Sequence, residues 1–388
     1  MTKTISPPGP RVREGELWTA KQRQMHSLHY VISYRASFKP ELPDYCIRKY
    51  SKAGDVVADP FCGRGTTALQ ANLLGRSAWV NDANPLAICI TRAKCSPVSL
   101  PEIESFLGDI NWQKKIDLQP DSDLLAFYHP DTLRELYLLK DAISREESET
   151  SRFVQLLALS RLHGHSTGFF SAYSMPQLSV LPEAQRRINQ KRGEEPPYRA
   201  VAPRIIAKAR RALKDNCLQA IRQSGAQNRY LQSDARNLSP WPDNSVDLVV
   251  TSPPFLNCVN YVHDNWLEHW FLNIDPSILK GRITQTASIR VWKSFVAHVL
   301  LEIGRILRVG GICVFEVGEV LCGGEKINLD EAVTQIIAEN RCGLQLMEVL
   351  IQKQQFTKLA HCFAVTNNKK GTNTQRLLVL EKSLSHET

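Results

Sequence analysis

The sequence predicts an α/β protein built on a doubly wound, Rossmann-like sheet. Two observations carry this prediction. Short apolar runs alternate with helical patterns along the chain, which is the order of parallel strands joined by crossover helices. A glycine-containing turn also follows the first of these runs, at the position where such sheets bind their ligands.

The predicted elements fall into two groups. The strand DVVADP precedes the helix TTALQANLL, and the strand SAWVND precedes the helix PLAICITRAK. After a long interval come RYLQSDA, VDLVVTSPP, the helix SFVAHVLLEIGRILR, and the strands GGICVFEVG, LQLMEVLIQK and TQRLLVLEK. This order fits a sheet whose last strand is antiparallel, formed by residues 1–95 and 229–388.

Residues 96–228 are predicted to form a mostly helical insert, because helical periodicity is common there and strand-like runs are few. Charge is uneven within it. Residues 96–150 contain 5 Lys/Arg and 12 Asp/Glu, whereas residues 151–228 contain 13 and 4. The second half of the insert therefore carries a local positive field.

Bulk properties restrict the function further. The chain has 388 residues, a formal net charge of +9 and a pI near 9.0, which favours a polyanionic partner such as nucleic acid. We find no signal-peptide core and no run of about 20 apolar residues, so we expect a soluble, cytoplasmic protein without a membrane partner. The ten cysteines form no C-x-x-C pair and have no histidine at metal-ligand spacing, so neither a disulfide framework nor a metal is indicated.

The turn DPFCGRGTT spans residues 59–67. Its Gly-x-Gly step lets backbone approach a ligand, and we expect Thr66 or Thr67 to cap the following helix. Such glycines also occur in turns that bind nothing, so this motif needs support from other strand ends.

Three further strand ends give that support. Asp82 follows the second strand about 20 residues after the glycine turn, where a carboxylate can accept both ribose hydroxyls. Asp234 and Ala235 follow the third strand and can meet an adenine. The fourth strand ends in TSPPF, residues 251–255. The strand ends thus converge on an adenosine-like ligand and one reactive tip.

DPFCGRGTT, NDANP, SDAR and TSPPF resemble the motifs of amino-group DNA methyltransferases, which methylate N4 of cytosine or N6 of adenine with S-adenosylmethionine. The stretch SLHYVISYRASFKPELPDYCIRKYSKAGD is similar to the family's segment that covers the methionine end of the cofactor. The resemblance covers about residues 25–95 and 229–385. It implies that 1–95 and 229–388 are two halves of a catalytic domain, and it makes the insert the candidate target-recognition region.

The resemblance also implies roles for individual residues. The cofactor-binding set that it implies is Phe38, Pro40, Asp59, Phe61, Gly63, Gly65, Thr66, Thr67, Asp82, Asn84, Asp234, Ala235 and Thr251. The implied catalytic loop is Ser252, Pro253, Pro254 and Phe255. Acceptors from the Ser252 hydroxyl and the Pro253 carbonyl would make the target amine nucleophilic, while Phe255 stacks on the flipped base. No covalent intermediate is needed, and we interpret Cys62 as a packing residue.

DNA contacts are predicted in the insert. The loop from His163 through His165 to Tyr173 is expected to face the bases, with core packing as the alternative. The residues expected to contact phosphates are Arg186, Arg187, Arg192 and Arg199, with a solvated helical face as the alternative.

The target atom predicted from the tip is N4 of cytosine in double-stranded DNA, because adenine enzymes of the family usually carry Asp where this chain has Ser252. The alternatives are an N6-adenine DNA methyltransferase, an RNA guanine-N2 methyltransferase and a non-catalytic DNA-binding protein of the same fold. A nicotinamide dehydrogenase fits less well, because Ala68 stands where the third glycine of G-x-G-x-x-G would fall. A cognate restriction endonuclease is the genetic partner that the family suggests.

Overall fold

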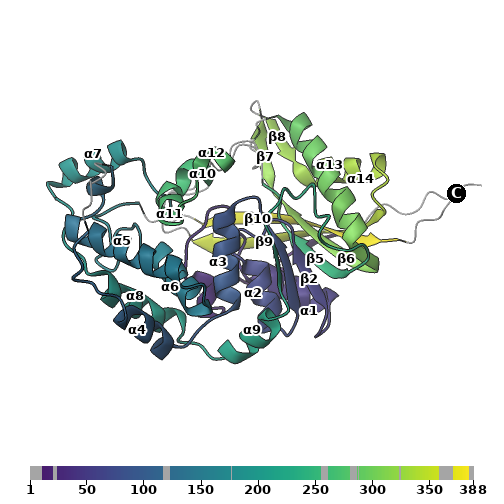
Figure 1. The fold of residues 1–388 in the computed structure, drawn as a ribbon. Helices are drawn as coiled ribbons and strands as arrows, with labels where there is room; N and C mark the ends of the chain where they lie inside the picture. Colours follow the sequence, from purple (N-terminus) through teal and green to yellow (C-terminus); the bar gives the residue numbers. More distant parts are fainter. Residues whose placement is uncertain are drawn as a thin grey trace, which may run out of the picture.

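The computed structural model describes residues 11–20, 24–116, 123–175, 177–254, 261–279, 286, 288–322, 325–357 and 370–383. Its centre is an eight-stranded sheet in the order β1-β9-β10-β6-β5-β2-β3-β4 (Figure 1). The strands are β1 (Arg11–Gly15), β2 (Val56–Asp59), β3 (Ser77–Asn81), β4 (Arg229–Leu231), β5 (Val246–Thr251), β6 (Leu307–Val317), β9 (Leu344–Thr357) and β10 (Lys370–Lys382). A two-stranded sheet pairs β7 (Glu319–Cys322) with β8 (Glu325–Asn328).

Strand direction confirms the predicted fold class. The last strand, β10, runs antiparallel to both β6 and β9, and the other pairings in this sheet are parallel. The edge strand β1, which pairs with β9, was not predicted. Its sequence RVREG alternates charges with a single apolar residue and provides no apolar run to mark a strand.

Helices cover both faces of the sheet because successive strand residues point to opposite sides. Val57 packs with α1 (Glu41–Tyr50) and α2 (Thr66–Leu73), whereas its neighbour Ala58 packs with α13 (Ile289–Ile306) and α14 (Leu329–Glu339). Figure 1 shows α13 and α14 together at one side of the molecule, above the strands β5 and β6. This two-sided burial is what a doubly wound sheet requires.

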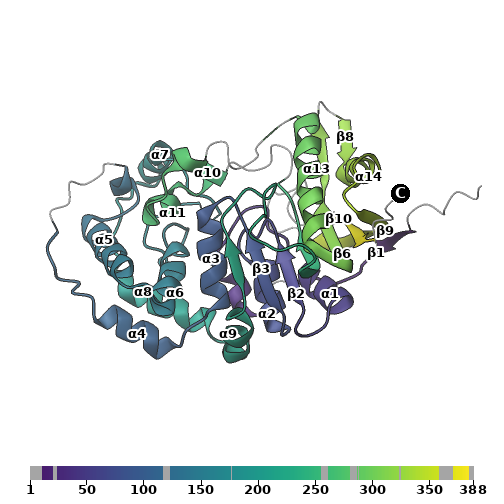
Figure 2. The same cartoon turned by 45° about the vertical axis from the view of Figure 1, so that its right-hand side comes forward.

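The insert forms a helical lobe beside the sheet (Figure 2). Its helices are α4 (Leu100–Gly108), α5 (Pro130–Arg145), α6 (Glu149–Leu159), α7 (Pro182–Arg192), α8 (Val201–Ala212) and α9 (Leu218–Gly225), with a 3-10 turn η2 (Leu124–Ala126). No β-strand is assigned between residues 96 and 228 in the part that the structure describes, which confirms the mostly helical prediction. One continuous apolar core joins α4, α5, α6 and α8 to α3 (Pro85–Cys95).

The two stems of the insert touch each other. A Cβ atom on Gly225, at the end of α9, would lie 2.2 Å from the carbonyl oxygen of Cys95, at the end of α3. Beside them, Asn72 and Asn228 exchange side-chain hydrogen bonds of 3.0 and 2.9 Å. The chain therefore leaves the sheet and returns to it at one point.

Short helices complete the described structure. They are η1 (Ser27–Tyr30), α10 (Tyr261–Asp264), α11 (Trp266–Phe271) and α12 (Pro276–Leu279). Trp266 and Phe271 of α11 pack on the core of the insert. Across the described residues, the helices include none with the length and apolar character needed to cross a membrane.

Candidate functional site

The glycine turn connects β2 to α2 at the carboxyl edge of the sheet. Gly63 and Gly65 have positive φ angles of 48° and 74°, which disfavour other residues. A Cβ on Gly65 would also lie 2.7 Å from the hydroxyl oxygen of Thr91. The predicted cap was wrong: Gly65 is the N-cap, and Thr66 and Thr67 are the first helical residues. The left-handed φ at the helix start excluded a threonine there.

Asp82 lies directly after β3 and organises the adjoining loops. Its carboxylate accepts the backbone N–H groups of Gly63 at 3.0 Å and Asn84 at 2.9 Å. Burial raises the pKa of Asp82 to about 6, although both hydrogen bonds oppose this rise. Asn84 caps α3 through Leu86 N–H and donates to the Tyr34 hydroxyl at 3.3 Å. Each Asp82 oxygen retains lone-pair capacity for a hydroxyl donor.

Asp234 follows β4 and is held by Arg236. The guanidinium donates to both carboxylate oxygens, at 3.0 and 2.6 Å, and the Arg236 N–H donates to one of them at 2.9 Å. Partial burial favours a higher pKa for Asp234, but these hydrogen bonds lower it. Arg236 also lies 5.7 Å from the ring centre of Phe295. The Asp234 carboxylate is thus oriented before any ligand binds.

These groups line one cavity, which we call the Asp82 cavity. It encloses about 880 Å³ of empty space, open mouth included. The predicted residues in its wall are Phe38, Phe61, Gly63, Thr66, Asp82, Asn84, Asp234, Ala235, Ser252, Pro253 and Pro254. Sequence reasoning missed Tyr34, Arg35, Ala36, Ser37, Pro60, Asn81, Ala83 and Phe295 as wall residues. The cavity therefore unites the glycine turn, both strand-end acids and the tip.

Several predicted cofactor residues lie behind this wall. The buried Asp59 accepts the Thr251 hydroxyl at 2.6 Å and Phe61 N–H at 3.1 Å, while burial raises its pKa to about 6. Thr67 donates to the Val250 carbonyl at 3.2 Å. Asp59, Thr67 and Thr251 therefore hold β2 and α2 against β5. Gly65 and Pro40 cap α2 and α1, outside the wall.

The tip follows β5 and is held from two sides. The indole N–H of Trp292, on α13, donates to the Pro254 carbonyl at 2.9 Å. The Ser252 side chain lies near enough to the Glu316 carboxyl on β6 to affect its pKa. Burial raises the pKa of Glu316, and the side chains of Ser252 and Gln375 oppose that rise. Phe255 lies outside the described residues.

Cys62 lines the Asp82 cavity but is unsuited to nucleophilic attack. Burial, with the nearby carboxylates of Asp82 and Asp59, raises the pKa of its thiol well above the usual range. In the described part of the chain, no cluster of three His, Cys, Asp or Glu side chains is arranged to hold a metal ion.

Comparison with known proteins places this site in a family. The model of N6/N4 DNA methylases matches residues 9–115, which include the glycine turn and Asp82. The type II methyltransferase M.BsoBI of Geobacillus stearothermophilus is 22% identical over 276 residues, covering 66% of this chain and 54% of that protein. The chain is similar to N6/N4 DNA methyltransferases in this part of its sequence. This similarity supports S-adenosylmethionine, the predicted cofactor.

Two other proteins show the reach of the similarity. The type II methyltransferase M.MjaII of Methanocaldococcus jannaschii is 28% identical over 95 residues, covering 24% of this chain and 18% of that protein. A proposed DNA modification methylase of Thermus thermophilus, solved with S-adenosyl-L-methionine, is 20% identical, with a TM-score of 0.23 over 40% of this chain and 56% of that chain. The chain spans about half the length of M.BsoBI.

The histidines predicted to face DNA have different environments in the structure. His163 is buried, and its ring nitrogens contact the Met175 carbonyl at 2.8 Å and Glu268 at 2.9 Å. Burial alone would lower the pKa of His163, but Glu268 raises it above the usual value. His165 is exposed, and Tyr173 lies under the Arg192 guanidinium at 4.1 Å. His165 and Tyr173 are thus placed at the surface, whereas His163 stabilises the loop.

The predicted phosphate-binding arginines already have protein partners. Arg186 pairs with Asp123 at 2.5 Å, Arg187 with Glu183 at 3.8 Å, and Arg192 with Glu194 at 2.8 Å. These pairs are largely exposed and hold their side chains only weakly.

Arg199 differs from these three arginines. It donates to the carbonyls of Ser166 and Phe169, both at 3.0 Å, and so braces the loop after α6. Contact of Arg186, Arg187, Arg192 and Arg199 with phosphates stays a prediction.

Proposed function

We propose that this protein transfers a methyl group from S-adenosylmethionine to the exocyclic N4 of cytosine in double-stranded DNA. The observation that carries the proposal is the Asp82 cavity, where an adenosine-type site and the Ser-Pro-Pro tip share one wall. The alternative target is N6 of adenine, which the same fold and tip would serve.

The residues of the cavity fit the cofactor. The Asp82 carboxylate is oriented by two backbone amides and retains acceptor capacity for two ribose hydroxyls. Asp234, oriented by Arg236, would accept an adenine amino hydrogen beside the apolar surface of Phe295. Tyr34 and Phe38 would cover the methionine end. When bound there, S-adenosylmethionine supplies an electrophilic methyl group.

The tip would activate the target amine. The amino nitrogen of cytosine is a poor nucleophile, because its lone pair is delocalised into the ring. The Ser252 hydroxyl would donate its proton to the nearby Glu316 carboxyl, which would leave the Ser252 oxygen free to accept an amino hydrogen. The Pro253 carbonyl would accept the second one. Two acceptors so placed favour a pyramidal nitrogen aimed at the methyl group.

Reaching this tip requires the base to leave the duplex. A paired base hides its amino group within the helix, so flipping precedes transfer. We propose that Phe255 stacks on the flipped base, as the resemblance implies. The insert would read the surrounding DNA, with His165 and Tyr173 facing the bases.

One assay tests the substrate and target atom together. The protein is incubated with radiolabelled S-adenosylmethionine and mixed DNA, and modified nucleosides are separated by mass. We expect N4-methylcytosine. If only N6-methyladenine is found, the target atom is N6 of adenine, and the rest of the proposed function is unaffected. Label in RNA but not DNA would favour the guanine-N2 alternative, and DNA binding without label would favour the non-catalytic one. Cytoplasmic location and a restriction endonuclease partner stay predictions.

A further inference from the structure

A second cavity lies beside the Asp82 cavity. It is formed by the segment 25–33, the end of α6 with the loop after it (159–169), the end of α8 with its continuation (208–214), and residues 264–268. We call it the Arg161 cavity. It contains about 1520 Å³ of empty space, open mouth included. Figure 2 shows α6 and α8 side by side in the insert lobe, where they also pack through the core.

The wall of the Arg161 cavity is strongly basic. The cations that line it are Arg161, Lys208, Arg211 and Lys214. Arg161 stacks on Phe169, with its guanidinium 4.0 Å from the ring centre. Within the described part of the chain, no carboxylate forms an ion pair with Arg161 or Arg211. Burial, and secondarily the charge of Arg211, lowers the pKa of Arg161 to about 10. The two guanidiniums therefore repel each other, and an anion between them would relieve this.

The carboxylates in the wall have partners other than Arg161 and Arg211. Asp264 forms an ion pair with Arg35 at 2.5 Å. Glu268 is buried, accepts from His163 at 2.9 Å, and accepts the Ser179 hydroxyl at 2.7 Å. Because both acids have their own donors, Arg161 and Arg211 give the cavity an attraction for anions.

A backbone link and an ion pair connect this cavity to the Asp82 cavity. Ser33 lines the Arg161 cavity and the next residue, Tyr34, lines the Asp82 cavity. The Arg35–Asp264 pair joins the same two walls, since Arg35 lines one cavity and Asp264 the other. A ligand that reaches both cavities must be extended and polyanionic on one side.

From this arrangement we propose that the Arg161 cavity holds backbone phosphates of the DNA strand whose target base enters the Asp82 cavity. The proposal rests on the proposed function, because it takes DNA as the substrate. Arg161, Lys208, Arg211 and Lys214 neutralise phosphates and release counterions, while the backbone on either side of the flipped nucleotide is held. The contact is independent of sequence and sets the register of the base.

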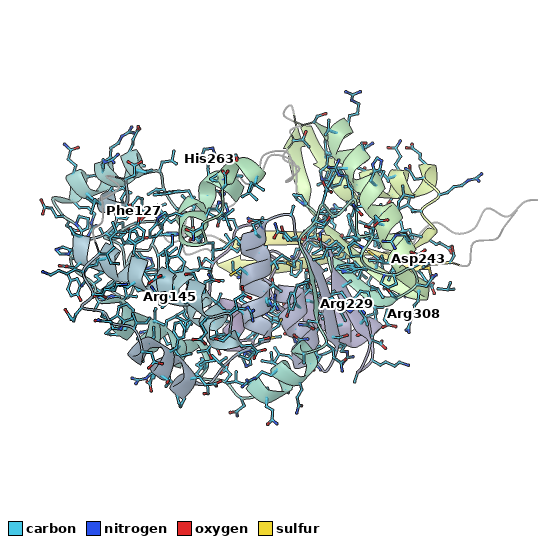
Figure 3. All side chains as sticks on the ribbon, viewed as in Figure 1. Phe127, Arg145, Arg229, Asp243, His263 and Arg308 are labelled. Carbon is cyan, nitrogen blue, oxygen red and sulfur yellow. The ribbon has the colours of Figure 1, made fainter. Side chains whose placement is uncertain are left out.

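The test measures binding of fluorescent duplex oligonucleotides at several salt concentrations. We expect the double variant Lys208→Ala with Arg211→Ala to bind all DNA sequences equally more weakly, by tenfold or more at low salt. The slope of log affinity against log salt concentration should fall by about two units. Lys208→Arg with Arg211→Lys should keep most of both. Arg145→Ala is the matched control, since Arg145 is an exposed arginine on α5 of the same lobe, outside this wall (Figure 3). S-adenosylmethionine affinity by calorimetry should be unchanged in every variant, which verifies folding.

The outcomes separate the two proposals. If the wild type methylates DNA but the double alanine variant keeps its affinity and salt slope, the phosphate site is refuted and the proposed function stands. If the wild type binds DNA through these residues but transfers no methyl group, the phosphate site stands and the proposed function falls. A wild type that binds no DNA refutes both.

Discussion

Trp292 and Pro254 are joined by a hydrogen bond of 2.9 Å, from the indole N–H to the backbone carbonyl, across 38 residues of sequence. The contact ties α13 to the loop that follows β5. Each proline fixes its own φ angle, and Pro254 also restricts the ψ angle of Pro253, so fixing the Pro254 carbonyl also limits the direction of the Pro253 carbonyl. The orientation of the tip is therefore set partly by α13, which packs on one face of the sheet.

Replacing Trp292 should slow methyl transfer without weakening the binding of the cofactor. Trp292→Phe retains an aromatic ring but leaves the Pro254 carbonyl without its donor, at a cost of about 1 to 3 kcal/mol. We expect the single-turnover rate to fall roughly tenfold. Trp241→Phe is the control, because Trp241 is equally buried in the same layer and lies outside the cavity wall. If both variants lose the same rate, the loss comes from altered packing and not from the missing hydrogen bond to Pro254.

Changes at Ser252 and Glu316 should separate chemistry from positioning. Ser252→Ala removes an acceptor at the target amine, and we expect roughly a hundredfold lower rate. Glu316→Gln keeps the shape but supplies an uncharged acceptor for the Ser252 hydroxyl, so a loss of about tenfold is expected. Cofactor affinity should stay near wild type in both. Gln375→Ala serves as the control, because it removes the other partner of Glu316 and spares Ser252. Wild-type rates in the Ser252 variant would exclude this loop as the tip.

Asp82 should dominate cofactor affinity. Its carboxylate is expected to accept two ribose hydroxyls, and hydrogen bonds to charged groups contribute about 1.5 to 3 kcal/mol each. Asp82→Ala should therefore lower the affinity for S-adenosylmethionine at least tenfold. Calorimetry measures this directly. Circular dichroism must show a folded variant, since Asp82 also binds two backbone amides. If the variant is folded and its affinity for S-adenosylmethionine is unchanged, Asp82 does not bind the ribose.

Cofactor binding should weaken in acid. The Asp82 pKa is raised to about 6, so the free protein takes up a proton as the pH falls through 6, whereas the ribose requires the ionised form. The dissociation constant should be flat above this pH and rise about tenfold per unit well below it. Asp82→Asn should bind weakly at all pH values. Asp59→Asn should retain the pH dependence, because Asp59 lies behind the wall. Proton uptake measured in two buffers provides an independent check.

The parts of the site that could be predicted are those carried by strand ends. Asp82, Asp234 and Ser252 each follow an apolar run, and the carboxyl ends of parallel strands meet at one edge of a sheet. Their convergence thus follows from local patterns. Glu316 also left a signal, because a carboxylate within the apolar strand GGICVFEVG requires a partner.

Other parts depend on contacts that no local pattern encodes. Phe295 is one of many apolar positions on α13, and only packing decides which of them lines the cavity. The Arg161 cavity combines residues from segments that are distant in the sequence. The basic run from Arg186 to Arg199 was visible in the sequence, but the sequence did not indicate that Arg199 would brace a loop. Composition indicates charge, and the fold decides how that charge is used.

The contact between Gly225 and Cys95 has a consequence for how such enzymes diversify. Because the insert begins and ends at one point, a change in its length need not displace β3 or β4. Closing a longer excursion costs little additional chain entropy. We propose that residues 96–228, the candidate target-recognition region, can be exchanged together with the side chains of α3 and α11 on which they pack. Transplanting them between relatives that keep the glycine at 225 and the Asn72–Asn228 pair should transfer the target sequence to a new host while its transfer chemistry is inherited unchanged.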